Sequence, residues 1–259
     1  MKESYIVEEI KDLKLNNPIF IEGLPGIGLV GKLAADHLIQ ELKAVKFADL
    51  YSPRFPHQAL VEKDSTMRLM KNEFYYYTGG KRDLLFLSGD TQPPPTDAYG
   101  HYEIASLILD FVQKFGVKEM FTLGGYSTGG YPVKEPKVLG AASDVETVEK
   151  YKDKNIVFRE DPGSAIVGAS GLIIAMGKLR DMRGLCLLGE SPGYIIDAKA
   201  SKAVLQVLVD ILELEVNMEE LDKRAEETEK ALSKIQEMQK NMTEYQTLSP
   251  GTEETGYIR

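Results

Sequence analysis

The chain of 259 residues is long enough for one large α/β domain or two small ones, and 43% of its residues are hydrophobic, which is ample for a core. Its formal net charge of −9 disfavours nucleic acid as a partner, because the average surface repels phosphate and no run of lysine or arginine offsets this. The longest apolar stretches, 165–176 and 205–214, are shorter than the roughly 20 residues of a membrane-spanning helix. The first residues form no apolar export segment, so we expect a cytoplasmic protein without a membrane partner.

The N-terminal part predicts a strand at Pro18–Glu22, followed by a glycine-rich turn over residues 23–31. A helical pattern continues from this turn to about Leu42, and another strand is predicted at Ala44–Tyr51. A strand that leads through a turn into a helix is the repeating unit of α/β folds.

The middle of the chain predicts strands at Ala59–Glu62 and Glu73–Thr78, which we interpret as an antiparallel excursion over 59–78. A strand at Asp83–Ser88 then passes through three consecutive prolines into a helix at Tyr99–Phe115. The helix is indicated by apolar residues that recur every three or four positions and form one buried stripe. They are Ile104, Leu107, Ile108, Phe111, Val112 and Phe115.

The following part predicts strands at Lys118–Leu123, Val138–Ala142 and Arg183–Leu188, the last leading into a helix at Ala198–Leu214. Residues 164–177 are apolar on nearly all sides and carry three glycines, which predicts a buried helix in close contact with neighbouring backbone. The order of elements predicts an α/β fold: a three-layer sandwich with a mostly parallel sheet, a C-terminal helix and a disordered tail.

The last fifth of the chain differs in composition. Residues 213–259 hold 12 acidic and 6 basic residues, a net charge of −6. We therefore divide the chain into an α/β domain at 1–216, a charged helix at 217–245 and a flexible tail at 246–259. Apolar residues of the helix, from Leu221 to Met242, follow an imperfect heptad pattern, so the helix either docks on its own domain or pairs with a second copy.

The glycine-rich turn contains a G-x-G-x-x-G pattern at Gly26, Gly28 and Gly31, with Asp49 about 20 residues downstream. This is the pattern of a dinucleotide-binding turn, and a nucleotide-dependent enzyme is therefore the alternative hypothesis. Against it, Gly23 and Pro25 lengthen the turn, and the lysine and hydroxyl residue of a P-loop are absent. We favour a structural turn packed under a neighbouring segment, formed by Gly23, Pro25, Gly26, Gly28 and Gly31.

Residues 125–129 match the G-x-S-x-G pattern of a serine nucleophile at Ser127. That motif requires a helix directly after the serine, but two glycines and a proline follow it within residues 129–132. No histidine occurs after His101, so the chain order of that catalytic triad is not available. A glycine-rich loop at the end of a strand is the better interpretation.

Other chemistry-bearing residues stand alone. The three histidines, His37, His57 and His101, lack metal-ligand spacing, and the single cysteine, Cys186, lies in an apolar run that indicates a buried side chain. Among the carboxylates, Glu22 and Asp90 end predicted strands at the edge where α/β sites form, although structural roles are favoured for both. We predict no catalytic residue, no metal and no cofactor.

Three segments together resemble the archaeal branch of the PAC2 family, relatives of the eukaryotic proteasome assembly chaperones. They are P-I-F-I-E-G-L-P-G-I-G-L-V-G-K at 18–32, L-G-G-Y at 123–126 and Gly189-Glu190. The resemblance covers roughly residues 5 to 245, and the block G-L-P-G-I-G-L-V-G-x-x-A is its most specific part.

The resemblance implies a homo-oligomeric, ATP-independent protein without catalytic activity that acts on 20S proteasome subunits. It also implies attachment to the proteasome α-ring through flexible C-terminal tails, in which a penultimate tyrosine enters a pocket between α-subunits. Here Tyr257 is third from the end, Ile258 takes the penultimate place, and Arg259 is terminal. The resemblance therefore assigns binding of the proteasome to Tyr257, Ile258 and Arg259, with the tyrosine one position further from the end than in the general pattern. An oligomeric scaffold for another partner is the remaining alternative.

Overall fold

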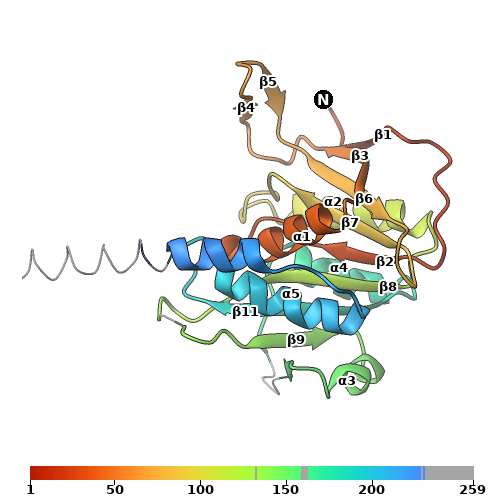
Figure 1. The fold of residues 1–259 in the computed structure, drawn as a ribbon. Coiled ribbons are helices and arrows are strands. Elements are labelled where there is room, and N and C mark those ends of the chain that lie inside the picture. Colours follow the sequence, from red (N-terminus) through yellow and green to blue (C-terminus); the bar gives the residue numbers. More distant parts are fainter. Residues whose placement is uncertain (132, 159–162, 229, 231–259) are drawn as a thin grey trace, which may run out of the picture.

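The computed structural model describes residues 1–131, 133–158, 163–228 and 230. At its centre lie four parallel strands, in the spatial order β7 (Leu84–Gly89), β2 (Ile19–Glu22), β8 (Glu119–Ser127) and β11 (Arg183–Ser191) (Figure 1). Their middle residues are buried, as expected for parallel strands that are covered by helices on both faces.

The strands that flank this centre are mostly antiparallel. On one side they are β6 (Asn72–Tyr77), β3 (Val45–Tyr51) and β1 (Tyr5–Glu8). Each runs antiparallel to its neighbour, beginning with β6 beside β7. On the other side, β9 (Val138–Ala142) runs antiparallel to β11, and β10 (Val157–Phe158) runs parallel to β9.

The sheet of 9 strands is therefore mixed, and the prediction of a mostly parallel sheet is wrong. Periodicity indicates a strand but not its direction, and the short link from β6 to β7 allows only an antiparallel pair. Strands β4 (Ala59–Val61) and β5 (Met67–Leu69) form a separate antiparallel pair, so the antiparallel interpretation of this region is confirmed.

Helices cover both faces of the sheet and complete three layers. The helices α1 (Val30–Glu41) and α5 (Ala198–Leu212) pack on one face, and α2 (Ala98–Gln113) and α4 (Ala169–Lys178) pack on the other (Figure 1). The shorter α3 (Val145–Tyr151) lies near β9. None of the helices described here is long and apolar enough to cross a membrane.

Three of these helices begin with an aspartate whose side chain accepts a hydrogen bond from a free backbone N–H of the first turn. Asp97 accepts from Gly100 N at 2.9 Å, Asp144 from Thr147 N at 2.8 Å, and Asp197 from Ala200 N at 2.9 Å. Each N-cap contributes about 1 kcal/mol to the helix it starts.

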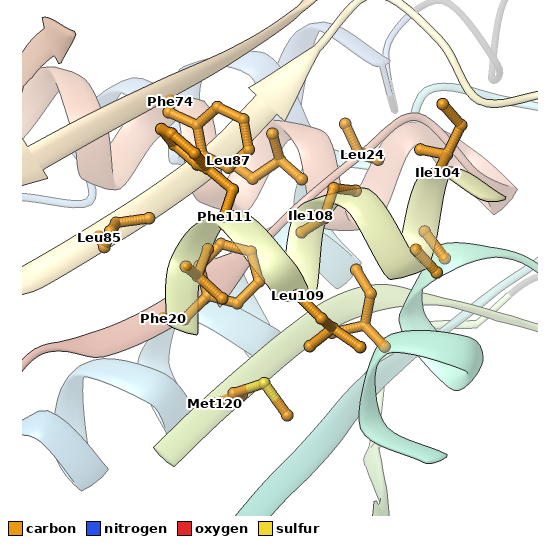
Figure 2. Packing of buried hydrophobic residues seen from close by; sticks show 14 of the residues in the cluster. Phe20, Leu24, Phe74, Leu85, Leu87, Ile104, Ile108, Leu109, Phe111 and Met120 are labelled. Atoms are coloured by element: carbon orange, nitrogen blue, oxygen red, sulfur yellow. The ribbon is translucent and has the colours of Figure 1, made fainter. Parts of the chain in front are cut away.

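The face under α2 shows why the predicted stripe forms a helix. Ile104, Ile108 and Phe111 of α2 pack against Phe20 and Phe74 of the sheet, and all of these side chains are almost fully buried (Figure 2). The ring centroids of Phe74 and Phe111 lie 4.7 Å apart. The aromatic and aliphatic packing fixes α2 on the sheet and confirms the periodicity argument.

Helix α4 differs from its prediction. Its inner side is buried at Ile173, Ile174 and Gly177, but Val167 before it and Leu179 after it are each 85% exposed. The prediction of a buried helix over residues 164–177 therefore holds only for the inner side of α4, since Ala175 within the helix is exposed as well. An apolar composition does not distinguish a helix inside the core from an outer helix with an exposed apolar side.

The outer strands carry a cluster of opposite charges that we call the charge lattice, consisting of Glu9, Lys46, Asp49, Lys71 and Glu73. Lys71 Nζ lies 3.0 Å from Asp49 and 2.9 Å from Glu73, and Lys46 Nζ lies 2.6 Å from Glu9. Because Asp49 and Glu73 are cross-strand partners, the two lysines separate carboxylates that would otherwise repel each other.

Candidate functional site

The glycine-rich turn connects β2 to α1 through a short 3-10 segment, Ile27–Leu29. A Cβ on Gly31 would lie 2.0 Å from the Leu123 carbonyl oxygen, and one on Gly23 would lie 2.4 Å from Ala35 Cβ. Gly28 has a φ of +60°, which favours glycine, whereas Gly26 has no atom within 4 Å of its Cβ position. Three of the four glycines are thus held against the protein's own domain.

The acidic residue of the dinucleotide hypothesis is not brought to this turn. Strands β6 and β7 lie between β2 and β3, and Asp49 on β3 belongs to the charge lattice. Asp49 is only 6% exposed and lies 3.2 Å from Lys46 as well as 3.0 Å from Lys71. The spacing of about 20 residues therefore does not bring an acidic side chain next to the glycine-rich turn, as the binding of a dinucleotide would require.

Glu22, at the end of β2, is fully buried. Its Oε1 accepts a hydrogen bond from Leu24 N at 2.9 Å, and its Oε2 accepts one from Ser170 Oγ at 3.2 Å. Burial raises the pKa of Glu22 to about 7, even though these two hydrogen bonds act to lower it. Glu22 is thus a carboxyl group that changes its charge near neutral pH.

Asp90, the other carboxylate considered, follows β7 and binds groups of its own domain. Arg68 Nη2 donates to it at 3.1 Å and Lys71 N at 2.9 Å. Burial acts to raise the pKa of Asp90, but these hydrogen bonds and the Arg68 charge bring it below its usual value. Asp90 therefore remains an ion-pair partner at neutral pH.

Ser127 lies exposed at the end of β8, where its Oγ accepts a hydrogen bond from Gly129 N at 3.3 Å. The histidines lie elsewhere: His57 is exposed in a loop, His101 is on α2, and His37 on α1 binds the C-terminal segment. Within the described part of the chain, no cluster of three histidine, cysteine or acidic residues is arranged to hold a metal ion.

Cys186 is buried in β11, as its apolar surroundings indicate. Burial raises the pKa of its thiol to about 12, and the hydrogen bond with Thr122 opposes this shift only partly. The thiol is therefore protonated and unreactive at neutral pH.

A cavity of about 520 Å³ lies at the carboxyl ends of β8 and β11, next to the glycine-rich turn. It is bounded by β9, by residues 164–167 and by the first turn of α4. Gln92 joins two of its walls, because Nε2 donates to Pro25 O at 2.8 Å and Oε1 accepts from Ala169 N at 2.8 Å. Sequence reasoning missed Gln92 and Ser170, since neither belongs to a motif.

The C-terminal segment docks on the domain. After α5 the chain turns back at Glu213, and His37 Nε2 donates to the Asn217 carbonyl oxygen at 2.6 Å. Residues 219–228 are helical, and Leu221 is 1% exposed among the apolar side chains of α1 and α5. Lys202 on α5 forms an ion pair with Asp222.

Of the two alternatives for the charged helix, docking on its own domain is thus observed for this part. The rest of the predicted helix at 217–245, and the tail residues Tyr257, Ile258 and Arg259, lie outside the described residues.

The fold and the glycine-rich turn agree with one protein family. The model of the PAC2 family matches residues 20–236, which include the turn, the cavity walls and the docked segment. The chain therefore belongs to the PAC2 family.

Similar proteins include PbaB of Pyrococcus furiosus, described as an archaeal proteasome activator. Its crystal structure has 56% sequence identity and a TM-score of 0.88, covering 91% of this chain and 100% of PbaB. Pyrococcus furiosus PbaA, described as an archaeal homolog of proteasome-assembly chaperone, has 27% identity and a TM-score of 0.73, covering 96% of this chain and 100% of PbaA. The uncharacterized protein MJ1210 of Methanocaldococcus jannaschii is 41% identical, covering 96% of this chain and 95% of that protein.

Proposed function

We propose that this protein is an ATP-independent proteasome assembly chaperone or activator that binds the α-ring of the 20S proteasome through its C-terminal tail. The observation that carries the proposal is the 56% identity to PbaB, an archaeal proteasome activator, over the whole of that chain. The role is non-enzymatic, and the protein acts in the cytoplasm as a homo-oligomer.

The docked C-terminal segment supports this role. Leu221 and the His37–Asn217 hydrogen bond hold the start of the segment on α1 and α5. Such an anchor lets the globular part remain rigid while Tyr257, Ile258 and Arg259 reach a partner. Several tails on one oligomer raise the effective concentration of one another.

Exposed apolar side chains support self-association. Val167 and Leu179 flank α4, and Tyr194 and Ile196 lie in the loop after β11, with exposed fractions of 57% or more. Apolar groups left in water are candidates for a subunit contact. Light scattering of the purified chain measures the mass directly, and a monomer at micromolar concentration would contradict the homo-oligomer.

The tail is tested by replacing residues 256–259 with Gly-Ser-Gly-Ser, which preserves the length of the chain. We expect an unchanged circular dichroism spectrum and unfolding midpoint, together with loss of binding to 20S particles in a surface-immobilised assay. Replacing residues 251–254 in the same way is the matched control and should preserve binding. Undiminished binding of the first variant would disprove the tail model.

A second assay distinguishes a proteasome activator from an assembly chaperone. An activator increases the hydrolysis of a short fluorogenic peptide by assembled 20S particles. An assembly chaperone instead accelerates particle formation from separate α- and β-subunits and leaves hydrolysis by finished particles unchanged.

A further inference from the structure

We propose that the cavity at the carboxyl ends of β8 and β11 binds a small, uncharged, largely apolar molecule that carries an N–H or O–H hydrogen-bond donor. This inference does not depend on the proposed tail contact, since the described lining of the cavity lies within residues 24–188.

The place and size of the cavity are those of a ligand site. Its volume of about 520 Å³ falls within the range of roughly 300–1,000 Å³ found for small-molecule pockets. Sites in α/β folds form at the carboxyl ends of the strands, where loops rather than helices meet. The apolar part of the wall includes Leu24, Ile27, Leu139, Ile166, Val167 and Leu188.

The charge of the lining determines which molecules fit. No Asp, Glu, Lys, Arg or His side chain is among the described residues that line the cavity. A phosphate would find no cation among these described residues, and the carboxyl group of Glu22 lies just behind Ser170. Because removing an unpaired charge from water is costly, the cavity favours an uncharged molecule over a nucleotide.

The polar groups of the wall determine the orientation of the molecule. Ser170 Oγ lies 3.2 Å from Glu22 Oε2 and 3.3 Å from the Leu123 carbonyl oxygen, and both of these atoms accept hydrogen bonds. When Glu22 is ionised, the hydroxyl hydrogen of Ser170 points to one of them. When Glu22 is protonated, it donates to Ser170, whose hydrogen then points to Leu123.

In both states Ser170 therefore presents a lone pair, and not a hydrogen, to the cavity. Gln92 spends one amide N–H on Pro25 and one lone pair of its oxygen on Ala169, so its side chain is held between the two walls. A molecule that fills the apolar space must consequently bring the donor itself, because an unsatisfied acceptor in such a site costs free energy.

Gly124 keeps the floor open beside Ser170. A Cβ at this position would lie 3.5 Å from Ser170 Oγ and 2.9 Å from Leu188 Cδ2. Any larger residue would occupy the space in front of the hydroxyl group. The glycine thus gives a bound molecule access to the acceptor.

The test uses two probes of nearly equal shape, indole and 1-methylindole, of which only indole has an N–H group. Both are titrated into the full chain by NMR, with shift changes in the backbone amides of 123–127 and 166–170 as the readout. We expect indole to bind about fivefold more tightly, which corresponds to one hydrogen bond of about 1 kcal/mol. Equal affinities, no binding of either probe at millimolar concentration, or shifts confined to other residues would overturn the proposal.

Variants of the protein test whether the preference for indole over 1-methylindole arises in the cavity. Ser170→Ala should make the two affinities equal while 1-methylindole binds within twofold of its original affinity. Ala165→Trp fills the cavity from its exposed mouth and should abolish binding of both probes, whereas Ala175→Trp on the outer side of α4 should change neither.

Each variant is first checked for an unchanged unfolding midpoint. If Ala165→Trp does not fold, Gly124→Ala replaces it, with a loss of affinity for indole expected from the occupied floor. Full binding of indole by a folded variant with a filled cavity would overturn the proposal.

Discussion

Gly31 lies so close to the Leu123 carbonyl oxygen that a Cβ on residue 31 would be 2.0 Å from it. This approach joins the first turn of α1 to the central strand β8. The obstacle is backbone, which cannot rotate away as a flexible side chain would. The contact therefore sets how closely α1 packs on the sheet.

Gly31→Ala should destabilise the protein by about 3 kcal/mol, at the upper end of the usual cost of overpacking a core, because either the helix or the strand must shift. Gly26→Ala is the matched control in the same turn, where no atom lies within 4 Å of the Cβ position and φ is −154°. We expect the control to change stability by less than about 0.5 kcal/mol. Urea unfolding at equilibrium measures both, and similar midpoints for the two variants would contradict the packing explanation.

Glu22→Gln should change the pH dependence of stability. The pKa of Glu22 is about 7 in the folded protein and near 4.5 when unfolded, so the folded state of the wild type binds the extra proton between these values. Stability therefore falls as pH rises from 4.5 to 7, and above 7 the buried charge costs roughly 3 kcal/mol. Glutamine avoids this cost, so we expect the variant to be more stable than the wild type at pH 8 and similar at pH 5.

Asp90→Asn is the control, because its effect on stability at pH 8 is expected to be opposite to that of Glu22→Gln. The pKa of Asp90 is lowered in the folded protein, so its ionised form stabilises the fold above its usual pKa and loses this contribution as pH falls. Asp90→Asn should be less stable than the wild type at pH 8. Thermal unfolding at pH 5 and pH 8 tests both, and a stability of Glu22→Gln below the wild type at pH 8 would refute the role assigned to burial.

Leu221→Asp should release the docked C-terminal segment. The side chain is buried between α1 and α5, and placing a charge there is unfavourable without a partner. Hydrogen exchange of amides 219–228 should become at least tenfold faster, while the central strands remain protected. Lys223→Asp, on the exposed side of the same helix, should leave exchange unchanged. Equal protection in both variants would show that Leu221 does not anchor the segment.

The register of the tail gives a further prediction. Exchanging the two residues, Tyr257→Ile with Ile258→Tyr, puts tyrosine in the penultimate position found in the general pattern of proteasome activators. We expect tighter binding to 20S particles, by at least threefold, and weaker binding for Tyr257→Ala. Binding is measured by interferometry with immobilised particles, and a weaker complex of the exchanged variant would show that the natural register is preferred.

The sequence predicts those elements whose signals are local. Ile104, Ile108 and Phe111 mark the buried side of α2, and the helix predicted from them is present. Strand direction is not local, because it depends on which distant strand becomes the neighbour. For this reason β9 could be placed as a strand but not as an antiparallel one.

The candidate site likewise combines local features, which the sequence indicates, with contacts between distant residues, which it does not. The glycine-rich turn is a local feature of the sequence, but the spacing from it to Asp49 carries no information about the two strands that separate them in the sheet. Ser170 and Gln92 come from loops and helix starts far apart in the chain, and only the fold brings them to one cavity. No pattern of neighbouring residues could have indicated that they meet.

The charge lattice on β3 and β6 has a consequence for the behaviour of the protein at high concentration. A flat sheet surface with apolar side chains readily stacks on another, whereas here the partly exposed Glu9, Lys46 and Glu73 would have to lose their water first. These charged groups already form ion pairs within one molecule, so the approach of a second sheet would add little favourable free energy. This part of the surface therefore favours colloidal solubility.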